Sequence, residues 1–263
     1  MVLYSTMLAL VPGAASAEPV FQAGFATIVR VQGEARYMVL GDTNWYPLLA
    51  GKILGVGTII QTSHDGIVDM ALGKAIEFPQ AEPVPDRIAF APDAKVRGMV
   101  SFRPAVEQNM IRMIGDTVLG IDELVLTDTG LDTVSETELD LKYGRVFATV
   151  KKLSAPSKYF IKIPGGVAGV RGTFFEIDAS GWCAVLKHSV LLAFGDGNGG
   201  TAPFLVNEGY QFDPATGQIT PLPQDELNRL QDAATALDTT YVSVISFQND
   251  GTSSFISPVT GHY

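Results

Sequence analysis

Short runs of alternating apolar and polar residues constrain this chain more than any other feature of its sequence. In residues 137–142 (TELDLK) the two leucines share one face, and residues 67–72 and 158–163 alternate in the same way. A period of two places one face of a strand in a core and the other in solvent. Residues 185–194 read as one longer strand or as two short ones.

Turn-forming residues separate these runs. The chain contains 27 glycines and 15 prolines, enough for many tight turns. Turns alternating with short strands favour an all-β fold, either a β-solenoid-like roll or a β-sandwich, over a parallel α/β fold. Residues 79–104, which are richer in proline, are predicted to be a loop or a strand with excursions. The turn segments are 40–44, 63–66, 129–130, 143–144, 180–181, 195–200 and 213–217.

One segment near the C-terminus has a helical pattern instead. Leu227, Leu230, Ala234 and Leu237 recur at helical spacing in residues 224–237, and two acidic residues occupy the first turn behind two prolines. Acidic side chains stabilise the start of a helix because of its dipole. We therefore expect a C-terminal α-helix that packs on the β domain as a cap.

These patterns divide the chain into four parts. Residues 1–17 are predicted to be a signal peptide, 24–222 a β domain, 223–240 the helix, and 241–263 a terminal strand followed by a loose tail. Residues 106–114 are a weaker candidate for one or two helical turns.

The N-terminus has the order of features expected for export. An apolar run over residues 2–11 is followed by a Pro-Gly pair and by Ala15 and Ala17, which suit cleavage before Glu18. The run is too short to span a bilayer, which needs about 20 residues. No lysine or arginine precedes Arg30, so the n-region is atypical, and a buried N-terminal element is the alternative. We expect a periplasmic or secreted protein with no stable transmembrane anchor after cleavage.

Charge and cysteine content exclude several classes of protein. The formal net charge is −10, which argues against nucleic acid as a partner, because such proteins need a basic face to replace counterions. The single cysteine, Cys183, excludes an intrachain disulfide framework and a multi-thiolate metal site. It is expected to be a buried, inert thiol.

No residue pattern predicts catalysis, a cofactor or a metal. The three histidines, His64, His188 and His262, have no metal-binding spacing. Ser63, His64 and Asp65 are adjacent, but the members of a catalytic triad meet in space and not in sequence. The sequence therefore favours a protein that is not an enzyme.

Two polar segments have a functional and a structural interpretation. Asp196 and Asn198 in residues 195–200 could bind Ca²⁺, but Asp-Gly and Asn-Gly pairs are common hairpin turns and the loop lacks a bidentate acid. The acidic residues within 122–140 could include a glycosidase pair, but a solvated strand face explains them more simply. We favour the structural interpretation for both segments.

The most specific segment is residues 162–177, KIPGGVAGVRGTFFEI. A strand ends in it, a glycine-rich turn with one arginine follows, and a new strand begins. The guanidinium of Arg171 can collect free backbone carbonyls, clamp a carboxylate, or contact a partner. The residues that carry this signature turn are Pro164, Gly165, Gly169, Arg171, Gly172 and Thr173.

The segment resembles the signature of FecR-type domains, and other parts of the chain extend the resemblance. Residues 45–62 look like the opening block of the family, 139–150 like its paired strands, and 185–192 and 206–211 like its closing strands. The resemblance covers roughly residues 27–222.

The resemblance implies a non-enzymatic protein of the sensory or binding type. Regulators of this family join a cytoplasmic anti-sigma segment and a membrane helix to a periplasmic domain, whereas this sequence is expected to have only the exported domain. We expect envelope signal sensing or protein–protein interaction, with an envelope or extracellular protein as partner. The alternative is an extracellular glycan- or matrix-binding structural module, for which exposed aromatic residues would stack on sugars. The candidates are Trp45, Tyr46, Phe174 and Trp182.

Overall fold

The computed structural model describes residues 20–76, 96–102, 108–130, 132–195, 200–238, 241–247 and 255–258. The predicted signal peptide with Ala15 and Ala17, the tip of the 195–200 turn and most of the C-terminal tail lie outside these residues. The elements in chain order are β1 (Val20–Ala23), β2 (Phe25–Gln32), β3 (Ala35–Val39), β4 (Tyr46–Pro47), β5 (Ile53–Leu54), β6 (Thr58–Thr62), β7 (Ile67–Gly73), β8 (Val96–Phe102), β9 (Asn109–Asp128), β10 (Thr133–Thr149), β11 (Lys158–Ile163), β12 (Gly166–Val170), β13 (Phe174–Asp178), β14 (Cys183–Lys187), β15 (Ser189–Gly195), β16 (Thr201–Asn207), β17 (Tyr210–Asp213), β18 (Gln218–Pro221), α1 (Gln224–Asp238), β19 (Tyr241–Phe247) and β20 (Phe255–Pro258).

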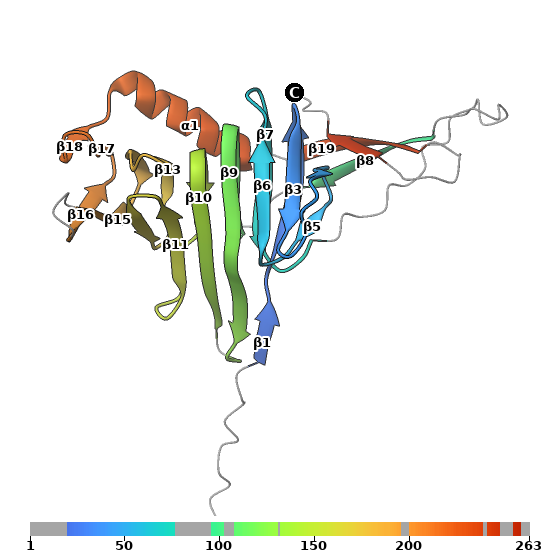
Figure 1. The fold of residues 1–263 in the computed structure, drawn as a ribbon, viewed down its shortest axis with the longest axis horizontal. Coiled ribbons are helices and arrows are strands. Elements are labelled where there is room, and N and C mark those ends of the chain that lie inside the picture. The colour runs from blue at the N-terminus through green and yellow to red at the C-terminus, as the bar shows by residue number, and fades with distance from the viewer. Residues whose placement is uncertain are drawn as a thin grey trace, which may run out of the picture.

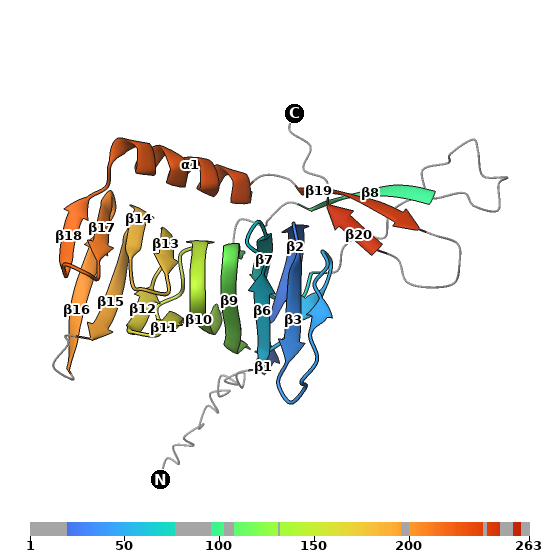
Figure 2. The same ribbon diagram turned by 45° about the horizontal axis from the view of Figure 1, so that its top comes forward.

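The strands form one large, open sheet that folds over on itself into two layers (Figures 1 and 2). The first layer runs β5-β2-β7-β9-β10-β13-β14-β17-β18. The second runs β4-β3-β6-β9-β10-β11-β12-β15-β16, and β1 pairs with the end of β9. The pairing of β10 with β11 is parallel. A separate sheet has the order β20-β19-β8.

The long strands β9 and β10 belong to both layers because each bends near its middle. Asp116 in β9 has a φ of 56° and Gly144 in β10 a φ of 81°, both in the left-handed region. The hydroxyl of Thr117 accepts a hydrogen bond from the Arg145 backbone N–H at 3.0 Å, and its single proton points to the carbonyls of Arg145 and Ile114. A Cβ atom on Gly144 would overlap Thr117, so the two bends cross at a point where only glycine fits.

The space between the layers is filled by the inward faces of both. Ile28 and Phe175 from the first layer and Ile60 and Val190 from the second are fully buried in one apolar cluster. Since successive strand residues alternate between faces, the period-two pattern of the sequence supplies this core. Cys183 is also buried in it, and burial raises the pKa of its thiol.

Helix α1 covers the outer face of the first layer. Leu230 and Leu237 are fully buried against Phe147 of β10 and Val29 of β2 in a second apolar cluster. The helix therefore packs on the domain through the stripe that its sequence predicts, and Figure 2 shows it lying across the row of strands.

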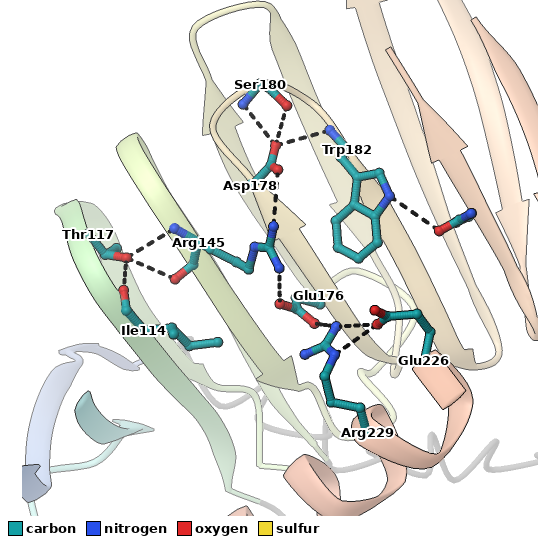
Figure 3. A network of polar contacts seen from close by, with 10 residues as sticks. Ile114, Thr117, Arg145, Glu176, Asp178, Ser180, Trp182, Glu226 and Arg229 are labelled. Carbon is teal, nitrogen blue, oxygen red and sulfur yellow. Dashed lines mark hydrogen bonds and ion pairs between the residues drawn. The ribbon is translucent and has the colours of Figure 1, made fainter. Parts of the chain in front are cut away.

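Ion pairs fasten this helix to the sheet (Figure 3). The carboxylate of Glu176 in β13 is fully buried and pairs with Arg229 of the helix at 2.5 Å and with Arg145 of β10 at 3.3 Å. Arg229 also pairs with Glu226 on the helix at 2.7 Å. A buried carboxylate needs such partners, because an unpaired charge in the interior is costly.

A second buried carboxylate lies on the same face of the sheet. Asp69 of β7 is fully buried and accepts hydrogen bonds from Arg112 Nε at 2.7 Å and Nη2 at 3.0 Å. Arg30 Nε lies 2.8 Å from Asp69 Oδ2, the oxygen that Arg112 Nη2 also contacts. The buried charge in the middle of β7 is thus paired with opposite charges on the two neighbouring strands, β2 and β9.

The all-β fold with a C-terminal helix is confirmed, with differences in detail. The helical turns expected in residues 106–114 are wrong from Asn109 onward, because this segment starts the long strand β9. Met110, Ile111 and Met113 are all buried, since the core covers one face of the strand and other side chains cover the opposite face. A run that is apolar on both faces does not show period two. Segment 185–194 is interrupted at His188, whose φ is 66°.

Replacing Leu230 tests how much the helix contact contributes. Leu230→Ala removes a fully buried side chain from the second cluster. We expect it to lower the free energy of unfolding by about 2–5 kcal/mol, the usual cost of a large-to-small change in a core. Chemical denaturation would measure this change. The control Gln231→Ala, on the exposed side of the helix, should change stability by no more than about 0.5 kcal/mol. Equal stability of the two variants would contradict a packed helix.

Candidate interaction site

The signature turn begins where β11 turns into β12. Pro164 and Gly165 form the connection, and a Cβ atom on Gly165 would lie 2.7 Å from the ring of Phe194 in β15. A Cβ atom on Gly166 would overlap the carbonyl oxygen of Ala193. The first glycines of the signature are therefore required because β15 approaches the backbone closely.

The second half of the signature carries the chain from one layer to the other. Gly172 has a φ of +87°, and a Cβ atom there would lie 2.9 Å from the Cα of Lys152. Thr173 is buried, and its hydroxyl donates to the Ser189 carbonyl at 2.9 Å. Its own carbonyl accepts from the N–H of Val150 at 2.9 Å. The crossing is thus tied both to β15 and to the loop that follows β10.

Arg171 reaches this same loop. Its Nη2 donates a hydrogen bond to the backbone carbonyl of Ala155, while the side chain stays on the surface. Of the roles that the sequence leaves open for Arg171, the structure contains the contact with a free carbonyl. Gly169 differs from the other signature glycines, because a Cβ atom there would make only ordinary contacts, with the Phe160 ring at 3.5 Å and the Leu191 carbonyl oxygen at 3.7 Å.

Positively charged side chains gather around the crossing. Lys151 Nζ and Lys187 Nζ lie 5.8 Å and 5.7 Å from the centre of the Phe174 ring. Lys152 lies against Gly172, and Lys187 pairs with Phe174 across the strands. We call this surface the basic edge, defined as Lys151, Lys152, Arg171, Lys187 and His188.

The basic edge is only partly neutralised. Lys151 pairs with Asp238 at the end of the helix at 3.3 Å, and Glu208 accepts a hydrogen bond from the His188 backbone N–H at 3.1 Å. Within the described part of the chain, no carboxylate forms an ion pair with Lys152 or Lys187. The edge can therefore attract a negatively charged partner surface.

Sequence reasoning missed the lysines of the basic edge. The Lys151-Lys152 pair is visible as a local charge cluster, but Lys187 is far away in sequence. Only the pairing of β13 with β14 brings it to Phe174.

The acidic segment of β9 and β10 forms a solvated strand face. Lys162 pairs with Asp122 at 3.0 Å and also with Glu138, and Lys158 pairs with Glu136 at 3.2 Å. Its contact with Glu138, and then that with Asp122, raises the pKa of Lys162. Neighbouring carboxylates are thus matched with lysines across strands, which favours the structural interpretation of this segment.

Ser63 and His64 are adjacent in sequence but bind different carboxylates. His64 Nδ1 lies 2.6 Å from Asp116, and this hydrogen bond raises the pKa of His64 above its usual 6.5. The hydroxyl of Ser63 donates instead to Asp65 at 2.8 Å. His262 lies outside the described residues.

The aromatic candidates differ in exposure. Trp45 is 36% and Tyr46 41% exposed, whereas Phe174 and Trp182 are half-buried. The indole N–H of Trp182 donates to Gln211 at 3.3 Å, and Arg145 lies over its ring. Only Trp45 and Tyr46 thus present large exposed aromatic surfaces among the candidates.

Neither a metal cluster nor a membrane-spanning helix is found in the described residues. They contain no cluster of three or more His, Cys, Asp or Glu side chains that could hold a metal ion. None of their helices is both long and apolar enough to cross a membrane.

Removing the Arg171 side chain tests whether its carbonyl contact is structural. Arg171→Ala deletes a charge-assisted hydrogen bond that holds the loop after β10, so we expect the free energy of unfolding to fall by about 1 kcal/mol. Thermal denaturation would detect the change, and Lys152→Ala, which removes an exposed side chain, is the matched control. Unchanged melting of Arg171→Ala together with lost partner binding would instead show that Arg171 acts by contacting a partner.

Comparison with known proteins gives a family match for the middle of the chain. One solved structure similar to this chain is that of a "putative anti-sigma factor" from Parabacteroides distasonis, with 13% identity and a TM-score of 0.30. The match covers 62% of this chain and 58% of that one, so this chain spans less than two thirds of that protein. No curated protein matches the chain. The family model described as FecR protein matches residues 106–188. The matched residues contain both bent strands and the signature turn, so the resemblance to the FecR family is confirmed for this segment.

Proposed function

We propose that this protein is an exported, non-enzymatic FecR-domain protein that acts in envelope signal sensing by binding another protein. The basic edge is the observation that carries the proposal. All of its residues lie within the segment 106–188 that matches the family, and they surround the signature turn. The signature turn would then both support the edge and present it.

The charge of the chain makes this edge distinctive. The protein has a formal net charge of −10, so an incompletely neutralised cluster of cations stands out from its overall field. Complementary potentials steer association and determine the orientation of two proteins. The partner that suits the edge is an envelope or extracellular protein with an acidic surface.

Charge reversal tests the edge. We expect Lys152→Glu combined with Lys187→Glu to reduce recovery of the native crosslinked partner from envelope fractions at least tenfold, because attraction becomes repulsion. The control Lys52→Glu with Lys142→Glu makes the same change in net charge on exposed lysines elsewhere. Mass spectrometry of crosslinked complexes would measure recovery, and melting curves would establish that both variants fold. Equal recovery with the two pairs of substitutions would refute a role for the basic edge.

Export has its own test. The apolar run and the Ala15 and Ala17 positions support cleavage before Glu18. We expect N-terminal sequencing of protein from the periplasm or the medium to begin at Glu18. Exported protein that retains residues 1–17 would contradict cleavage, and protein confined to the cytoplasm would contradict export.

A further inference from the structure

A cavity beside β3 and β4 lies away from the basic edge. Its volume is about 620 Å³, within the range of small-molecule sites. We call it the Trp45 pocket. Its lining includes Glu34, Arg36, Trp45, Tyr46, Gln61 and Ser63.

The apolar part of the pocket is aromatic and exposed. Trp45 and Tyr46 are exposed aromatic side chains of its wall, which also includes the exposed side chain of Leu49. Tyr46 belongs to β4, which pairs with β3. The ring of Tyr46 lies 5.7 Å from that of Tyr37, which supports it from the sheet. Such rings offer flat apolar surfaces without having to be uncovered first.

The polar part is held in place before any ligand arrives. The guanidinium carbon of Arg36 lies 4.5 Å from the centre of the Trp45 ring, and Arg36 Nε donates to Gln61 Oε1 at 2.9 Å. This arrangement leaves the Gln61 amide N–H groups and the terminal guanidinium nitrogens of Arg36 to donate to a ligand. Preorganisation lowers the entropic cost of binding.

A network in the preceding turn fixes the position of Tyr46. Its hydroxyl donates to Asp42 at 2.8 Å, and the backbone N–H of Asn44 donates to the same carboxylate at 2.9 Å. The aromatic wall is therefore built from both sides, by the turn and by the sheet.

From this combination we propose that the Trp45 pocket binds a neutral saccharide. A sugar ring has an apolar C–H face that packs on an aromatic ring, and a rim of hydroxyls that both donate and accept hydrogen bonds. The pocket supplies an aromatic wall, the donors of Arg36 and Gln61, and the acceptor of Glu34. The charged side chains of the lining are Glu34 and Arg36, whose charges cancel, so the pocket favours a ligand without net charge.

The sheet edge formed by β4, beside the Trp45 pocket, is poorly suited to binding an extended peptide. β4 is two residues long and contains Pro47, which has no backbone N–H. Addition of a strand depends on a row of main-chain hydrogen bonds, which such a short strand interrupted by proline cannot supply.

The two tryptophans of the chain allow a direct test. In Trp182→Phe the remaining tryptophan is Trp45, so its fluorescence reports on the pocket alone. We expect saturable changes on titration with at least one of chitohexaose, cellohexaose and maltohexaose. Calorimetry with the unsubstituted protein should give the same affinity, since Trp182 lies outside the pocket.

Substitutions in the pocket decide the outcome. Trp45→Ala should weaken binding at least tenfold, and Gln61→Leu, which keeps the side-chain size and leaves the aromatic wall intact, should also weaken it. Neither substitution should change recovery of the crosslinked partner that binds the basic edge. A negative result for the pocket therefore leaves the proposed function standing, and the reverse also holds. The proposal would be overturned if none of the three oligosaccharides binds. It would also be overturned if both variants bind the oligosaccharide as tightly as the unsubstituted protein does. Saturation of the pocket by a hexaglycine peptide when no saccharide binds would overturn it as well.

Discussion

The hydrogen bonds between Thr117 and the backbone of Arg145 hold together the bends on which the architecture depends. Each of β9 and β10 leaves one layer and enters the other at this point, so every further strand is added to a pair of layers whose spacing is already set. Gly144 has to be a glycine here because its neighbour approaches too closely for a side chain. A buried hydroxyl that satisfies both backbone groups makes the bend possible without unpaired polar atoms.

The crossing at the signature turn repeats this solution with other residues. At the signature turn, Gly172 provides the positive φ and Thr173 provides the hydroxyl that binds the neighbouring strand. At both crossings a glycine adopts the positive φ that the backbone requires, and a threonine hydroxyl binds the backbone of the neighbouring strand. The glycines and the threonine of the signature turn are in this sense a structural requirement, whereas Lys152 and Lys187 beside it form no ion pair within the described residues.

Helix α1 makes the two outer faces of the roll unequal. It buries part of the first layer through Leu230 and Leu237 and through the Arg229–Glu176 ion pair. The outer face of the second layer carries instead the matched lysines and carboxylates of β10 and β11. The basic edge and the Trp45 pocket both lie where loops are held against paired strands, and a rigid scaffold favours precise recognition.

Local patterns in the sequence did predict the strands at residues 67–72, 137–142 and 158–163, the C-terminal helix and the glycine-rich signature turn. Each of these depends on periodicity or on the backbone freedom of glycine within a few residues. The turn predicted at residues 143–144 is wrong, because these residues lie inside the continuous strand β10, which bends at Gly144. Local pattern also failed at residues 109–114, because burial on both faces at the start of β9 removes the alternation by which a strand is recognised. Only the tertiary structure decided that Lys151 and Lys187 flank Phe174 and that Arg36 and Gln61 meet beside Trp45. The physical reason is that alternation determines which way a side chain points, whereas the register between distant strands determines what it meets.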